Sequence, residues 1–115
     1  MTTIYHNPRC SKSRQTLAIL EENGVKPEIV LYLDQHLDKA TLKSLINKLG
    51  LNGPRELIRK GEDAYKQMSL SDSALDDEAL IDAIIQAPKL LERPIVVKGN
   101  KAVIGRPPEN VLNLL

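Results

Sequence analysis

The only cysteine of the chain, Cys10, lies in a segment of polar and basic residues. Positive charge close to a thiol favours the thiolate, which is the form that attacks electrophiles. Three basic side chains lie within four positions of the thiol, namely Arg9, Lys12 and Arg14. A lone cysteine is commonly a small apolar residue of the core, but polar neighbours on both sides disfavour that interpretation here. We therefore predict that Cys10 is a nucleophile.

Three further side chains near Cys10 are candidates to tune it. The hydroxyl groups of Ser11 and Ser13 can donate hydrogen bonds to the sulfur, and His6 either tunes the thiol or only bonds to a backbone carbonyl. Ser13 also stands where an enzyme with a Cys-x-x-Cys motif has its second cysteine. With one cysteine, no internal disulfide can form. Electrons for any redox step at Cys10 must therefore come from another molecule.

A strand, a turn and a helix are expected to position the thiol. Residues 2–6 read as a short strand that ends at Asn7-Pro8, and residues 28–33 read as a second strand buried on both faces. A helix between them makes a β-α-β unit, whose strands are parallel. In α/β sheets, ligands bind beyond the carboxyl ends of the strands. This unit places Cys10 at such an end.

The intervening helix is predicted over residues 11–23. Ser11 is expected to be its N-cap and Gly24 to end it, since serine and glycine favour these two positions. Its buried side is predicted to comprise Leu17, Ala18 and Leu20. The free N–H groups at its start carry partial positive charge, which further favours a thiolate at Cys10.

The rest of the chain completes an α/β fold. Residues 36–90 read as an all-helical insert, with helical patterns at 39–49, 54–58, 64–70 and 76–86. Two short strands at 94–98 and 101–105 are joined by Gly99-Asn100, a typical hairpin turn. Pro107-Pro108 opens a final helix. The order is βαβ, a helical insert and then ββα, within a single domain over residues 1–115.

Composition excludes several classes of function. Lys and Arg number 16 and Asp and Glu 15, so the net charge is +1. Proteins that bind nucleic acid or membrane surfaces normally have a basic excess, so neither partner is expected. The N-terminus lacks the pattern of a signal peptide, and no apolar run reaches transmembrane length. A lone thiol suits the reducing cytosol, so a cytoplasmic location is predicted.

Four separated segments of the chain form a recognisable set, namely His6-Asn7-Pro8-x-Cys10-x-x-Ser13-Arg14, Leu57-Ile58-Arg59-Lys60, Glu92-Arg93-Pro94-Ile95-Val96-Val97 and Gly105-Arg106-Pro107. These segments resemble those of one known family, the glutaredoxin-dependent arsenate reductases (ArsC). They occur in the order that the family has them and span nearly the whole chain. The resemblance implies a thioredoxin-like fold with the helical insert. The loop around Cys10 is most similar to that of a YfgD-like subgroup.

The resemblance also implies roles for particular residues. Arg59, Arg93 and Arg106 are expected to bind arsenate or a similar oxyanion, because arginine is always protonated and offers a rigid fork of donors. Pro94 is expected to follow a cis peptide bond and to face the thiol. The active-site loop contributes the nucleophile and supporting groups, namely Cys10, His6, Ser13 and Arg14.

In the mechanism that the resemblance implies, the thiolate attacks arsenic and displaces water. Glutathione, as co-substrate, then attacks the adduct, and glutaredoxin removes the glutathione as a mixed disulfide while arsenic falls to As(III). The expected enzyme has no bound cofactor and no metal, and it acts as a monomer. Where established reductases of the family have Gly-Thr, this chain has Ser11-Lys12.

Three other classes of protein share the activity, the fold or the kind of site. Phosphatase-like arsenate reductases need Cys-x-x-x-x-x-Arg, but Arg14 follows Cys10 by only four positions, which excludes that class. A regulator similar to Spx, which binds RNA polymerase, shares the fold, although Ser13 rules out its disulfide switch. A general glutathione-linked thiol oxidoreductase could use the same site. The last two stay open on sequence alone.

Overall fold

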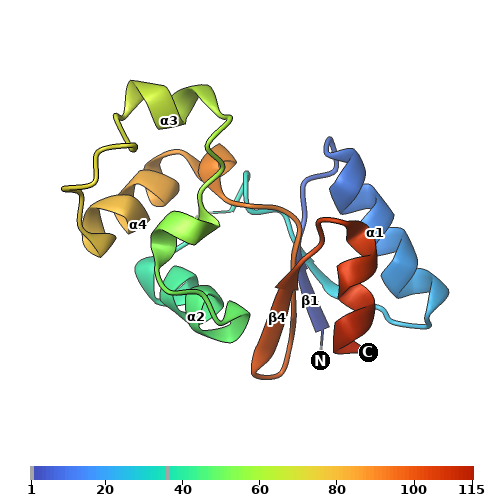
Figure 1. The fold of residues 1–115 in the computed structure, drawn as a ribbon. Coiled ribbons are helices and arrows are strands. Elements are labelled where there is room, and N and C mark those ends of the chain that lie inside the picture. Colours follow the sequence, from blue (N-terminus) through green and yellow to red (C-terminus); the bar gives the residue numbers. More distant parts are fainter. Residues whose placement is uncertain (1, 36) are drawn as a thin grey trace. The chain divides into compact units, whose positions relative to one another are not determined.

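The computed structural model describes residues 2–35 and 37–115 (Figure 1). Contacts divide the chain into two units, Met1–Gln35 with Arg93–Leu115, and His36–Glu92. The first unit contains the sheet and the second is helical. The predicted starts of the domain at residue 1 and of the insert at residue 36 lie outside the described residues.

A mixed four-stranded sheet forms the centre of the first unit, in the order β2-β1-β3-β4. The strands are β1 (Thr2–Tyr5), β2 (Glu28–Val30), β3 (Ile95–Lys98) and β4 (Lys101–Ile104). β1 is parallel to β2 and antiparallel to β3, and β3 and β4 form an antiparallel hairpin. Gly99 adopts a φ of 61° in the hairpin turn, a left-handed conformation that glycine adopts without steric cost. The predicted β-α-β unit and hairpin are confirmed.

Helix α1 (Ser11–Glu22) and the 3-10 helix η3 (Pro108–Leu114) lie side by side and contact one another (Figure 1). A cluster of fully buried side chains joins them to the sheet, namely Ile4, Leu20, Val96 and Val111. Ile4 and Val96 are directly paired across β1 and β3. Burial of each such side chain stabilises the fold by about 1.5–3 kcal/mol. This packing fixes the start of α1 next to the end of β1.

Two expectations about the first unit are wrong. The second strand is shorter than residues 28–33 and is not buried, since Ile29 is 46% exposed. The physical reason is its position at the edge of the sheet, where β1 is its only neighbour. In α1, Ala18 is exposed and does not belong to the buried side, whereas Leu20 is buried and Leu17 packs against the core, as predicted. The buried residues of the helix are Ser13, Thr16 and Leu20.

The second unit consists of short helices, and all but the 3-10 helix at residues 88–90 agree with the predicted helical patterns. They are α2 (Lys39–Leu49), η1 (Pro54–Leu57), α3 (Asp63–Gln67), α4 (Asp77–Gln86) and η2 (Pro88–Leu90). Asp38 and Asp76 are the N-caps of α2 and α4, and each carboxylate accepts a backbone N–H at 2.8 Å. Such caps stabilise a helix by about 1 kcal/mol. Gly50 ends α2 with a φ of 70°, a left-handed conformation that glycine favours at helix ends.

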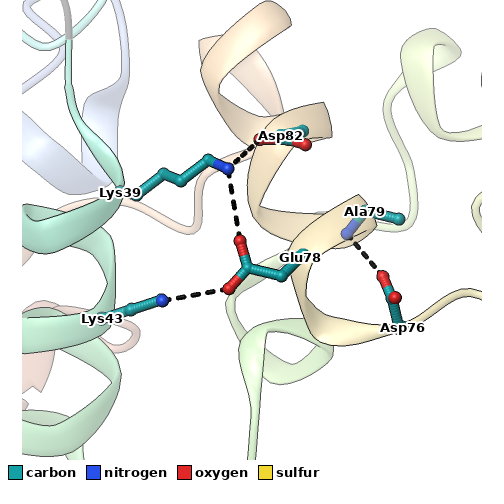
Figure 2. Close-up of polar contacts among 6 residues, drawn as sticks. All are labelled: Lys39, Lys43, Asp76, Glu78, Ala79 and Asp82. Atoms are coloured by element: carbon teal, nitrogen blue, oxygen red, sulfur yellow. Dashed lines mark hydrogen bonds and ion pairs between the residues drawn. The ribbon is translucent and has the colours of Figure 1, made fainter.

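Exposed ion pairs join α2 to α4 (Figure 2). Lys39 Nζ lies 3.3 Å from carboxylate oxygens of both Glu78 and Asp82, and Lys43 Nζ lies 3.0 Å from Glu78. Each of these side chains is about half exposed, so the pairs are screened by solvent and stabilise the unit little. Buried aliphatic side chains of the same two helices, including Leu42, Leu45, Leu80, Ile81 and Ile84, are the main stabilising groups.

Candidate active site

Cys10 is the N-cap of α1, a position that the sequence had indicated for Ser11. Its backbone is extended, with φ −95° and ψ 122°, and its carbonyl accepts the N–H of Arg14 at 3.0 Å. The preceding turn is closed by the Cys10 N–H, which donates to the Asn7 carbonyl at 3.0 Å. The Asn7 side chain also accepts the Arg9 N–H at 3.0 Å. The expectation for Ser11 is therefore corrected by one residue, and the thiol itself occupies the cap.

The N-cap position explains the electrostatics of the thiol. A side chain at an N-cap lies near the second and third N–H groups of its helix, which here belong to Lys12 and Ser13, although Cys10 makes no side-chain cap hydrogen bond. Partial burial raises the pKa of Cys10. The Ser13 N–H, the guanidinium of Arg93 and the Lys12 N–H together outweigh it, and the pKa of the thiol lies below its ordinary value. The cysteine is therefore poised to be a thiolate.

Two of the three predicted arginines lie against this thiol, both within the first unit. Arg106 Nη2 lies 3.7 Å from Cys10 Sγ, and Arg106 Nε donates to the backbone carbonyl of Arg93 at 2.8 Å. Burial lowers the pKa of Arg93, but the thiol and the hydroxyl of Tyr32 raise it more, so Arg93 is held in its charged form. The Arg93–Pro94 peptide is cis, as the resemblance implies. The result is a nucleophile with two neighbouring guanidinium groups.

His6 and Ser13 form a buried hydrogen-bonded pair behind the thiol. His6 Nδ1 lies 2.6 Å from Ser13 Oγ, which also accepts the Asn7 N–H at 3.1 Å. Burial, and then the charge of Arg14, lower the pKa of His6, which favours a neutral ring. The Ser13 hydroxyl therefore has His6 Nδ1 as a hydrogen-bond partner, and its donation to the sulfur stays a prediction. Ser13 reaches the thiol through its backbone N–H.

Arg14 braces the loop that carries the thiol. Its Nη1 donates to the backbone carbonyl of Pro8 at 2.8 Å. Because this bond spans the turn before α1, it restrains the loop that leads into Cys10. Arg14 therefore restrains the loop through its hydrogen bond to Pro8, and its charge lowers the pKa of His6.

Arg59 belongs to the second unit, whereas Arg93 and Arg106 belong to the first. Its N–H donates to the Leu90 carbonyl at 2.7 Å, and the neighbouring Ile58 forms an isolated antiparallel bridge with Leu91. Its Nε lies 3.8 Å from a carboxylate oxygen of Glu62. These contacts fix the backbone of Arg59 within its own unit. Its role at the thiol stays a prediction.

Tyr32 is a site residue that the sequence did not indicate. It lies just after the edge strand β2, is fully buried, and its hydroxyl interacts with Arg93. The chain has no Phe or Trp and only three Tyr. A tyrosine within an aliphatic stretch was therefore no more than a weak indication, in the sequence, that Tyr32 belongs to the site. Only the parallel pairing of β1 with β2 brings Tyr32 to the end of the sheet where Cys10 lies.

A titration of the thiol tests the electrostatics directly. Absorbance of the thiolate at about 240 nm should rise with a midpoint below the free-thiol value of about 8.5. Below this midpoint the thiol is protonated and alkylation by iodoacetamide should slow. Because the folded pKa is the lower one, the thiolate stabilises the fold above the unfolded pKa, and this is lost as pH falls through the folded pKa. The chain unfolded in guanidinium chloride is the control, and an equal midpoint there would contradict the assignment.

Neither a metal site nor a membrane-spanning helix is found among residues 2–35 and 37–115. No three His, Cys, Asp or Glu side chains gather there as ligands for a metal ion. None of the helices in that part of the chain combines the length and apolar character needed to cross a membrane.

The chain is similar to known proteins in its sequence. Residues 5–114 match the ArsC family. The chain is 61% identical over 112 residues to the uncharacterized protein YfgD of Escherichia coli strain K12, covering 97% of this chain and 94% of that protein. It is 47% identical over 112 residues to an arsenate reductase of Haemophilus influenzae, covering 97% of each.

A solved structure agrees with the fold. An arsenate reductase from Vibrio cholerae superimposes with a TM-score of 0.97 at 50% sequence identity, covering 99% of this chain and 97% of that one. The likeness extends over both the sheet and the helical insert, because nearly all of each chain is covered. The α/β, thioredoxin-like fold implied by the sequence motifs is confirmed.

Proposed function

Because this chain belongs to the ArsC family, we propose that it is an arsenate reductase that draws its electrons from glutathione and glutaredoxin. The observation that carries the proposal is the thiol of Cys10 beside the guanidinium groups of Arg93 and Arg106. A lowered thiol pKa supplies the nucleophile, and the two cations supply a binding site for an anion. The arsenate reductases among its relatives add support for the substrate.

The chemistry of the substrate fits such a site. Arsenate is tetrahedral and, like a phosphate group, carries about one to two negative charges near neutral pH. Guanidinium groups bind tetrahedral oxyanions through parallel, charge-assisted hydrogen bonds. The same cations would stabilise charge on the oxygens as sulfur attacks. Arg59 is proposed as a third cation for this substrate, on the strength of its motif position in Leu57-Ile58-Arg59-Lys60.

The proposed reaction has four steps. The Cys10 thiolate attacks As(V), an oxygen leaves as water, and a sulfur–arsenic bond forms. Glutathione then displaces a second oxygen as water and adds its own sulfur to arsenic. A glutaredoxin thiol attacks the glutathione sulfur, the arsenic–glutathione bond breaks, and its electron pair stays on arsenic, which becomes As(III). Water then releases arsenite from Cys10. Overall, two thiols become one disulfide and arsenate loses one oxygen as water.

The proposed setting follows from this chemistry. No second cysteine is needed, in agreement with the single cysteine of the chain. Glutathione takes part as a co-substrate, so no resident cofactor is proposed. The reductants are those of a reducing compartment, which supports a cytoplasmic location. We propose a monomer, which presents the exposed side of the thiol to glutaredoxin.

A coupled assay tests the proposed function. The protein is mixed with glutathione, glutathione reductase, glutaredoxin and NADPH, and arsenate is added. Arsenate-dependent oxidation of NADPH is expected, and omission of glutaredoxin should abolish it. Phosphate added in place of arsenate is the control, because it binds as a similar anion but cannot be reduced by thiols.

Other outcomes would favour the alternatives. Turnover without glutaredoxin would retain arsenate reduction but reject the proposed route of the electrons. NADPH oxidation with a glutathionylated peptide and none with arsenate would favour a general thiol oxidoreductase. No turnover with either, together with binding to purified RNA polymerase, would favour a regulator.

A further inference from the structure

Gly105 lies where three segments of the active site meet. It is buried at the end of β4, directly before Arg106. A Cβ atom built on it would lie 2.5 Å from Thr16 Oγ1 and 3.1 Å from Thr16 Cγ2 on α1. The same atom would lie 2.8 Å from Pro94 Cγ. Real Cβ atoms essentially never approach another heavy atom to below 3.0 Å, so a side chain at this position would require its neighbours to shift.

The neighbours of Gly105 have little freedom to move. Thr16 is fully buried, and its Oγ1 donates to the backbone carbonyl of Lys12 at 2.8 Å. That bond fixes the Thr16 side chain in its rotamer and ties it to the first turn of α1. On the other side, the Gly105 N–H donates to the Pro94 carbonyl at 2.8 Å. The close approach is therefore held by hydrogen bonds on both sides.

Each of the three segments carries one member of the thiol–guanidinium cluster. Cys10 opens α1, Arg93 directly precedes Pro94, and Arg106 directly follows Gly105. Arg106 is bound to the Arg93 carbonyl, so the two arginines move together. A displacement of Gly105 away from Thr16 would therefore carry both guanidinium groups away from the sulfur.

We propose that Gly105 is a positioning residue: the absence of its side chain lets β4 contact Thr16 and thereby sets the separation between Cys10 and its two arginines. The proposal concerns the geometry of the site, and it holds whether the substrate is arsenate or another oxyanion. It differs from a role in packing alone, which would affect the stability of the fold without affecting the thiol.

The substitution Gly105→Ala tests the proposal through the titration of Cys10. Loss of a nearby cation raises the pKa of a thiol, and we expect a rise of about one unit. The thiolate absorbance reports on this single cysteine, and the thermal midpoint is measured on the same samples. Gly61→Ala is the matched control, because a Cβ there has nothing within 4 Å and Gly61 is exposed. The control should titrate as the wild type does.

A second substitution distinguishes positioning from misfolding. Thr16→Ala removes both Thr16 atoms that a Cβ at residue 105 would meet, and a change of ring pucker can move Pro94 Cγ. The double variant Gly105→Ala/Thr16→Ala is therefore expected to fold and to regain at least half of the pKa shift. Thr16→Ala alone controls for the lost hydroxyl and should titrate close to the wild type.

Several results would overturn the proposal. One is a Gly105→Ala protein with a lowered thermal midpoint but a wild-type thiol pKa, which would indicate a packing role alone. Another such result is a folded double variant whose thiol pKa is as high as that of the unfolded chain. This result would count against the proposal even if the single variant does not fold. Since arsenate turnover is not the readout, failure of the proposed function leaves this test intact.

Discussion

Replacement of Cys10 by serine is expected to reduce arsenate-dependent turnover by at least about 10³-fold, because a serine hydroxyl is not ionised near neutral pH and is a poor nucleophile without a base. Ser13 and Lys12 direct N–H groups at the sulfur, and Arg93 adds its charge. These groups stabilise a thiolate but cannot ionise an alcohol to a useful extent. The coupled NADPH assay measures the loss, with glutathione and glutaredoxin in excess.

Binding separates this effect from damage to the site. Serine is a preferred N-cap residue, so the Cys10→Ser helix should form at least as well as the natural one. Arg93 and Arg106 remain, and arsenate should still bind in calorimetry with an affinity within about tenfold, equal to about 1.4 kcal/mol. A Cys10→Ser protein that retains more than a small fraction of turnover would show that sulfur does not attack arsenic.

Local patterns in the sequence predicted the elements of the fold well. The β-α-β unit, the Gly99-Asn100 hairpin and the helix at residues 39–49 are all found, because each depends on residues within a few positions of one another. The exposure of Ile29 was not predicted. Whether a strand lies at the centre or the edge of a sheet depends on strand order, which sequence patterns near Ile29 do not contain.

The site was predicted less completely, for a related reason. The thiol could be found from its own neighbours, and two arginines from their motif positions. The sequence could not identify the hydrogen-bond partner of the Ser13 hydroxyl. A ring nitrogen and a sulfur were both candidates, and only the distance in the structure identifies the ring nitrogen of His6 as a partner. Tyr32 and Gly105 act across segments that are far apart in the chain. Such contacts follow from the packing of α1 against the sheet and from the pairing of β2 with β1.

Arg93→Ala is expected to have the second-largest effect, with kcat/KM for arsenate reduced by about 10²–10³-fold. The side chain of Arg93 interacts with the thiol, while only its backbone carbonyl binds Arg106, so the substitution removes a cation and keeps the contact between the two segments. Charge-assisted hydrogen bonds contribute about 1.5–3 kcal/mol each, and two of them to an oxyanion account for a loss of this size. The pKa of Cys10 should rise by about one unit in the same variant.

An exposed arginine next to the thiol provides the control for Arg93. Arg9 directly precedes Cys10, but it is exposed and is not among the groups that shift the pKa of the thiol. Arg9→Ala should therefore change kcat/KM by less than about threefold, as is usual for screened surface charge. Arg93→Lys should lie between the two, since lysine retains the charge but loses the planar fork. If Arg9→Ala and Arg93→Ala lowered kcat/KM equally, anion binding would depend on the general positive charge around the loop. The specific guanidinium contacts at Cys10 would then not explain it.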